Sequence, residues 1–184
     1  MTTIPRPTVR SATPDDADAM GALSVRAWRA AYPGVMPQAY LDGLDGAERA
    51  AMWRAATTRP DRPGRGVLVA VAEGRVLGFA AWGAEQLDEP DAGPSGAPDG
   101  RGELYAINVD PGAWGSGTGQ ALIVAARDGL AAAGYREAVL WATPSNDRAR
   151  RFYRCDGWRQ DGAERVSDVG GVTVATVRYH RHLP

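Results

Sequence analysis

The sequence predicts a mixed α/β or α+β fold, in which one sheet carries helices on both of its faces. Three patterns indicate this class: an early helical region, a β-hairpin around Glu73-Gly74-Arg75, and two strand-then-helix units that lead into a second hairpin around Gly170-Gly171. We expect a single domain over residues 1–184, because a chain of 184 residues suffices for one sizeable core.

The first third of the chain is predicted to be mostly helical. Val9-Arg10 starts an edge strand, and Thr13 caps a helix in which Pro14 takes the first position. Apolar side chains at helical spacing carry this helix to about Ala31. Two shorter helices are expected near 37–44 and 47–57, and a Pro/Gly-rich connection follows at 59–66.

Strands dominate the rest of the chain. They are expected at 67–72, 76–82, 103–109, 138–142, 158–166 and 172–179. Helices are expected from Thr118 to Ala133 and from Ser145 or Asn146 to Cys155, each followed by a terminating glycine. Acids, prolines and glycines fill 85–102, which indicates a flexible loop within one domain.

Composition excludes several classes of function. The net charge of −1 does not favour a nucleic-acid or membrane-surface protein, and no apolar run has the length of a membrane span or the form of an export signal. The only cysteine, Cys155, cannot form an internal disulfide; we expect a small core residue in a cytoplasmic protein. His180 and His182 lack metal-ligand spacing, so we expect them to be solvated and predict no metal site.

The chain contains no lysine, so all 21 of its Lys and Arg residues are arginine. A P-loop requires a lysine at the nucleotide phosphates, and a pyridoxal-phosphate enzyme requires a Schiff-base lysine. Both classes are therefore excluded.

A glycine loop between a strand and a helix is the strongest functional signal. Gly115, Gly117 and Gly119 stand at alternate positions directly before a helix pattern. Such a loop presents backbone N–H groups to an anion such as a phosphate, although a plain turn is an alternative. A dinucleotide-binding loop is disfavoured, because Gln120 stands where that motif requires glycine.

Two segments together resemble one family. Trp114–Gly119 resembles the pyrophosphate loop of the GCN5-related N-acetyltransferases (the GNAT superfamily), and Asn146–Trp158 resembles that family's Asn-x-x-Ala-x-x-x-Tyr-x-x-x-Gly-Phe segment. The order of elements agrees over nearly the whole chain. The resemblance implies a mostly antiparallel central sheet flanked by helices on both faces. Trp114 departs from the family's Gln or Arg, and Trp158 from its Phe.

The resemblance implies acetyl-coenzyme A (acetyl-CoA) as the acyl donor. Its pyrophosphate would lie on the glycine loop, and its pantetheine arm along the preceding strand. The residues implied in cofactor binding are Ile107, Asn108, Val109, Trp114, Gly115, Ser116, Gly117, Thr118, Gly119, Gln120, Asn146 and Tyr153.

The resemblance also implies the catalytic groups. Tyr153 would donate a proton to the leaving thiolate, and Glu103 would accept the proton of the attacking amine, directly or through water. Strand alternation predicts Glu103, Tyr105, Ile107 and Val109 on one face of the sheet. Taken alone, Tyr153 also fits a core aromatic, Asn146 a helix N-cap, and Glu103 a solvated acid.

Aromatic side chains are the candidates for the acceptor site. Trp28 and Tyr32 in the early helical region, and Tyr105 on the strand, would line it, although each also fits a core position. Four arginines of the last helix either meet the 3′-phosphate of coenzyme A or form a solvated face. They are Arg148, Arg150, Arg151 and Arg154.

The sequence therefore predicts an N-acyltransferase that moves an acetyl group from acetyl-CoA to an amine by direct transfer in a ternary complex, without a metal. The acceptor is a small molecule or a peptide. The alternative is a catalytically silent acyl-CoA-binding sensor or structural domain. A homodimer is compatible with the resemblance.

Overall fold

The computed structural model describes residues 6–58, 64–86, 100–169 and 171–184. The chain opens with β1 (Thr8–Ser11) and a 3-10 turn (Pro14–Asp16), and continues with α1 (Ala17–Ala31), α2 (Gln38–Asp42) and α3 (Gly46–Thr58). Thr13 and Asp16 form a capping box at the start of this helical region, and Arg10 pairs with Asp16 at 2.7 Å. The predicted early helices are confirmed; part of the predicted 59–66 connection lies outside the described residues.

Seven strands form one sheet in the order β1-β2-β3-β4-β5-β7-β6. The strands after β1 are β2 (Gly66–Ala72), β3 (Arg75–Ala84), β4 (Gly102–Val109), β5 (Glu137–Ala142), β6 (Arg159–Val169) and β7 (Val172–His182), with α4 (Thr118–Ala132) and α5 (Asp147–Cys155) between them. Every neighbouring pair is antiparallel except β4 with β5. The predicted mixed, mostly antiparallel sheet is confirmed.

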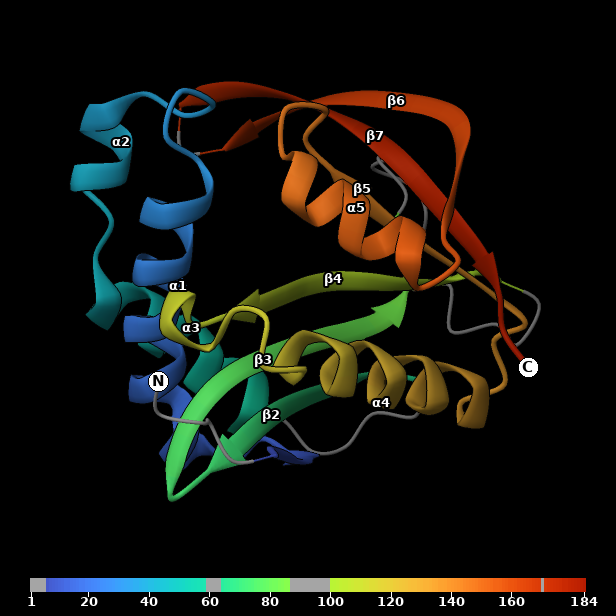
Figure 1. Cartoon of the computed structure of the whole chain (residues 1–184), viewed down its shortest axis with the longest axis horizontal. Coiled ribbons are helices and arrows are strands. Elements are labelled where there is room, and N and C mark those ends of the chain that lie inside the picture. The colour runs from blue at the N-terminus through green and yellow to red at the C-terminus, as the bar shows by residue number, and fades with distance from the viewer. Residues whose placement is uncertain (1–5, 59–63, 87–99, 170) are drawn as a thin grey trace.

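Helices cover both faces of the sheet, as the alternation of apolar residues along the strands requires. Figure 1 shows α4 and α5 in front of the sheet, whereas α1 and α3 lie toward its other side. One core layer joins α4 and α5 to the sheet through Leu122, Leu130 and Tyr153. The other joins α1 and α3 to it through Met20 and Trp53.

The ladder between β4 and β5 is very short. It contains two residue pairs, Gly102 with Ala138 and Glu103 with Val139. Beyond Glu103, β4 has no partner on its β5 side among the described residues, so its backbone there is an open edge inside the sheet. This edge leads directly into the glycine loop and the start of α4.

A β-bulge in β4 overturns the predicted alternation. The register with β3 shifts between the pairs Ala81–Ala106 and Trp82–Leu104, which leaves Tyr105 as the extra residue. Consequently Leu104, Ile107 and Val109 all pack toward α4 and α5, and the prediction that Glu103 shares a face with Ile107 and Val109 is wrong.

Three smaller expectations also differ from the structure. Gly102 belongs to β4, and Arg101 pairs with Glu85 across the base of the predicted 85–102 loop, whose residues 87–99 lie outside the described residues. Cys155 is exposed, not a core residue. β7 runs to His182, beyond the expected end at residue 179, and so includes both histidines; the His182 side chain is exposed, as expected, and lies 3.1 Å from Glu137.

Candidate functional site

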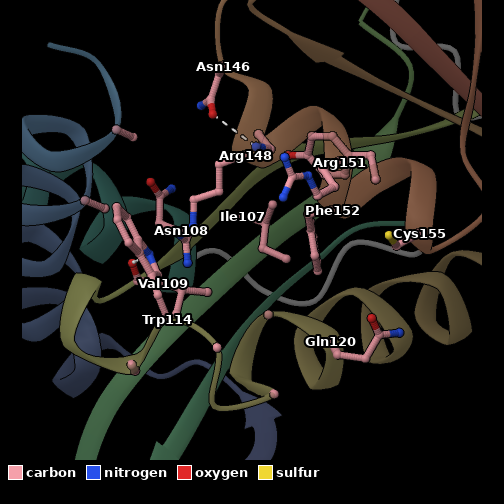
Figure 2. A pocket seen from close by; sticks show the side chains of 18 of the residues that line it. Ile107, Asn108, Val109, Trp114, Gln120, Asn146, Arg148, Arg151, Phe152 and Cys155 are labelled. Carbon is pink, nitrogen blue, oxygen red and sulfur yellow. Dashed lines mark hydrogen bonds between the residues drawn. The ribbon is translucent and has the colours of Figure 1, made fainter.

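A cavity of about 680 Å³ lies where the open edge of β4, the glycine loop, α5 and the end of α1 meet (Figure 2). It brings together most of the residues that the sequence singled out. Those that line it are Tyr32, Ile107, Asn108, Val109, Trp114, Gly115, Gly117, Gly119, Gln120, Asn146 and Tyr153.

The glycine loop is held in place by Asp110, the residue that follows β4. One oxygen of its carboxylate accepts a hydrogen bond from the Gly112 N–H, and the other accepts two from the Arg26 guanidinium of α1, at 2.9 and 2.6 Å. Gly115 and Gly117 then adopt φ values of 80° and 87°, a left-handed conformation that favours glycine. The loop is thus fixed by local geometry and by α1.

Four backbone N–H groups of this loop point to anion binding. The N–H groups of Gly115, Gly117, Gly119 and Gln120 donate to no protein acceptor in the ranges that the structure describes. They stand at the N-terminus of the 15-residue helix α4, where the helix dipole favours negative charge. Because three of the four belong to glycines, a ligand can approach the backbone closely.

The side chains of Ser116, Thr118 and Gln120 serve the protein itself. The Ser116 hydroxyl donates to the Ala113 carbonyl at 2.7 Å and lies 2.8 Å from the Thr118 hydroxyl. The Gln120 amide donates to Asp156 at 3.0 Å. Neither Ser116 nor Thr118 lines the cavity, so their predicted contribution is limited to the shape of the loop.

Trp114 and Arg148 both line the cavity and contact each other. The indole N–H of Trp114 donates to the Val109 carbonyl at 3.0 Å, so this donor is already used within the protein. The Arg148 guanidinium, from the first turn of α5, lies 4.0 Å from the centre of the Trp114 ring, which is a cation–π contact. Figure 2 shows Arg148 reaching from α5 toward Trp114.

Tyr153, on α5, is buried and lines the cavity. Its ring packs 5.4 Å from Phe152 and 6.1 Å from Tyr179, measured between ring centres. Burial, followed by the neighbouring phenols of Tyr32 and Tyr179, raises the pKa of Tyr153 well above its ordinary value of 10. Tyr153 is therefore a neutral phenol that retains its proton.

Asn146 caps α5 and lies beside Tyr32. Its side-chain oxygen accepts a hydrogen bond from the Ala149 N–H at 3.0 Å, which fixes the first turn of the helix that carries Tyr153. Burial raises the pKa of Tyr32, and the Asn146 amide opposes that rise. The end of α1 and the start of α5 thus meet at the cavity.

Three further predicted residues, besides Ser116 and Thr118, lie outside the cavity. Glu103 is buried, and its carboxylate accepts a hydrogen bond from the Gln86 N–H at 2.8 Å. Tyr105 is partly exposed, and its hydroxyl donates to the Ala84 carbonyl. Partial burial, followed by the Glu103 charge, raises the pKa of Tyr105 to about 12. Trp28 packs between Tyr32, Tyr40 and the Arg49 guanidinium, which lies 4.7 Å from its ring centre.

The cavity also contains residues that were not predicted for it. Two sequence patterns could have indicated them. One is the helical spacing of small side chains on α1, and the other is the i, i+3 spacing of Phe152 and Cys155 on α5. Of the four arginines on α5, Arg148 and Arg151 line the cavity; Arg150 instead binds the Tyr179 hydroxyl and the Pro144 carbonyl. The lining residues that the sequence did not single out are Ala27, Ala31, Ala113, Ala149, Phe152 and Cys155.

Comparison with known families agrees with this geometry. The sequence profile of the acetyltransferase (GNAT) family matches residues 25–158, which include the glycine loop and α5. The chain belongs to the GNAT family of acetyltransferases.

Curated relatives match part of this sequence. A mycothiol acetyltransferase of Frankia alni is 36% identical over 89 residues, which are 48% of this chain and 26% of that relative. The chain therefore spans only a minor part of this curated relative.

Solved structures of GNAT proteins share the fold over the full length. A GCN5-related N-acetyltransferase from Rhodopseudomonas palustris superposes with a TM-score of 0.73 at 20% identity, covering 100% of this chain and 99% of the other. The PaiA N-acetyltransferase of Thermoplasma acidophilum, solved in complex with coenzyme A, gives a TM-score of 0.67 at 16% identity, covering 96% and 98%. No helix in the described ranges has the length and hydropathy needed to cross a membrane.

Proposed function

We propose that this chain is a single-domain N-acetyltransferase that transfers the acetyl group of acetyl-CoA directly to an amine in a ternary complex. The observation that carries the proposal is the cavity itself. It combines four N–H groups at a helix N-terminus and a strand edge, all without protein partners among the described residues, and a buried phenol.

The cavity fits the chemistry of coenzyme A. A pyrophosphate needs several N–H donors with little steric hindrance, and the N–H groups of Gly115, Gly117, Gly119 and Gln120 offer them. The pantetheine arm carries amides, which pair with free backbone groups as an added strand does. The open edge of β4 over Ile107–Val109 supports such pairing, with the Val109 carbonyl already occupied by Trp114.

Tyr153 is proposed as the general acid. Acetyl-CoA supplies an activated acyl group as a thioester, so its reaction with an amine releases a thiolate. A neutral phenol that lines the same cavity would stabilise the developing charge by donating a hydrogen bond, and then its proton. Asn146 holds the first turn of the helix that carries this phenol.

Glu103 is proposed as the group that accepts the amine proton. It stands at the last paired position of β4 with β5, where the two strands separate, and it lies on the sheet face opposite Ile107 and Val109. This position supports an acceptor that approaches from the side opposite the donor. Proton transfer then passes through water, because Glu103 does not line the donor cavity.

The acceptor is proposed to be an amine, with Tyr32 on the cavity wall and Trp28 behind it as the acceptor-side aromatic residues. Tyr105 is exposed beside Glu103 and is a further candidate. Because the Frankia alni relative is a mycothiol acetyltransferase, amines related to mycothiol are among the compounds worth testing. A cytoplasmic location and a homodimer are part of the same proposal.

Thiol release from acetyl-CoA, measured with a panel of amines, tests this function. We expect turnover with at least one amine, and a decrease in kcat of about 100-fold in Tyr153→Phe because a general acid contributes about 10²- to 10⁴-fold. Coenzyme A affinity should not change, since the substitution removes only the hydroxyl.

Tyr135→Phe is the matched control, because the Tyr135 hydroxyl donates to the Gly64 carbonyl outside the cavity. Its kcat should equal that of the unaltered protein. Tight binding of coenzyme A without thiol release from any amine would contradict an enzyme and support a silent acyl-CoA sensor. Unchanged kcat in Tyr153→Phe would contradict the general-acid role.

A further inference from the structure

The Trp114–Arg148 pair has no role in the function proposed above. Both side chains line the cavity, one from the glycine loop and the other from α5. Trp114 directly precedes Gly115, the first residue of the anion-binding loop. The contact therefore brings a guanidinium to the loop from a residue 34 positions later in the sequence.

Within the described residues, Arg148 is a charged group without a charged partner. No carboxylate lies within 4.0 Å of its guanidinium in the described part of the chain, although many other arginines there have one. Its neighbour Arg150 is engaged by Tyr179, Pro144 and Asp147. The position of Arg148 is instead set by stacking on Trp114 at 4.0 Å.

The Trp114 ring is itself held in place. Its indole N–H is bonded to the Val109 carbonyl at the end of β4, so the ring stands at a fixed angle beside the open strand edge. A planar guanidinium stacked on a fixed ring keeps its N–H groups free to bind an anion at the ring edge. Such groups match phosphate oxygens in geometry and charge.

We propose that Arg148, positioned by Trp114, binds the pyrophosphate of the donor coenzyme from the side opposite the glycine-loop N–H groups. The pyrophosphate is favoured over the 3′-phosphate because Trp114 is continuous with the loop that carries those four N–H groups. Arg148 is the binding group, and Trp114 is a positioning residue. The inference rests on the proposed function, since it takes coenzyme A as the ligand.

Calorimetric titration with coenzyme A, dephospho-coenzyme A and pantetheine tests this assignment. Arg148→Ala should lower the affinity for coenzyme A about 10- to 100-fold, because a charge-assisted hydrogen bond to an anion is lost. Dephospho-coenzyme A retains the pyrophosphate, so the affinity of Arg148→Ala for it should fall by a similar factor. Pantetheine has no phosphate, so its affinity should not change.

Arg154→Ala is the matched control, because Arg154 is an exposed arginine of the same helix that does not line the cavity. The affinity of Arg154→Ala for each of the three compounds should stay within about twofold of that of the unaltered protein, since exposed charges away from a ligand contribute little. This control separates a specific contact from a general loss of positive charge.

Two variants of Trp114 test its positioning role. Trp114→Phe keeps an aromatic platform and should bind coenzyme A nearly as well as the unaltered protein. Trp114→Ala removes the platform, and the double variant with Arg148→Ala should be no weaker than Arg148→Ala alone, because the two residues act as a unit. Additive losses would overturn the positioning role.

The possible outcomes separate this inference from the proposed function. If the unaltered protein binds coenzyme A and Arg148→Ala binds it equally well, the role of Arg148 is overturned while the proposed function stands. A loss that disappears with dephospho-coenzyme A overturns the pyrophosphate assignment. Absence of coenzyme A binding by the unaltered protein overturns the proposed function, and this inference with it.

Discussion

At the scale of single residues, Tyr153 illustrates how burial selects a chemical role. A phenol in water loses its proton near pH 10. Burial and two neighbouring phenols disfavour the charged form of Tyr153, so its pKa lies above that value. Tyr153 is therefore suited to donate a proton and unsuited to act as a base.

The direction of this shift predicts the pH dependence of the reaction. A raised pKa keeps the acid protonated to higher pH, so kcat/KM should rise as the acceptor amine loses its proton and should not fall below about pH 10. A pH–rate profile with any accepted amine measures this. A decline below pH 10 that Tyr153→Phe abolishes would contradict the shift.

The positions of individual residues could be predicted where a motif fixes local backbone geometry. Tyr153 and Asn146 occupy the cavity because their helix positions follow from a cap and a 3.6-residue period. Glu103 was assigned to the wrong face, since one bulged residue, Tyr105, reverses the alternation. A bulge depends on how β3 and β4 pair, which the sequence of β4 alone does not encode.

At the scale of elements, a buried carboxylate joins three of them. Asp156 follows α5 and accepts hydrogen bonds from Gln120 of α4 and from the Trp158 indole, both at 3.0 Å. Arg181 of β7 and Arg127 of α4 lie 3.7 and 3.5 Å from it. This network fixes the end of the helix that carries Tyr153.

Asp156→Ala should therefore lower the free energy of unfolding by about 3 kcal/mol, because it leaves buried donors and partly buried charges without a partner. A decrease in Tm of about 6–12 °C is expected for a chain of this size. Thermal unfolding followed by circular dichroism measures it. Asp128→Ala, an exposed acid on α4, is the control and should change stability by less than about 0.5 kcal/mol.

The helices and strands could be predicted from the sequence, but the pairing of the strands in the sheet could not. The strands and the helices α4 and α5 could be predicted from apolar periodicity, and the helix ends from the glycines that follow them. Gly134 and Gly157 adopt φ values of 94° and 87°, as terminating glycines do. The order β5-β7-β6 and the two-pair ladder of β4 with β5 follow from long-range packing. No local pattern reports them.

At the scale of the whole molecule, the open edge of β4 links ligand binding to stability. A ligand that binds only the folded protein stabilises it by about 2.7 kcal/mol at 100 times its Kd. Coenzyme A at that concentration should raise Tm by about 5–10 °C. Differential scanning fluorimetry measures the shift, and pantetheine at equal concentration should give a smaller one. No shift at a concentration that saturates the protein by calorimetry would contradict the donor site.

The two-pair ladder between β4 and β5 also has a mechanical consequence. The first described strand, β1, lies in the part of the sheet before this ladder, and the last strand, β7, lies in the part after it. Tension applied between the chain ends therefore loads this seam, which has the fewest paired residues of the ladders between described strands. A molecule bridging β4 and the start of α5 would brace the seam, so rupture force in single-molecule stretching becomes a direct measure of cavity occupancy.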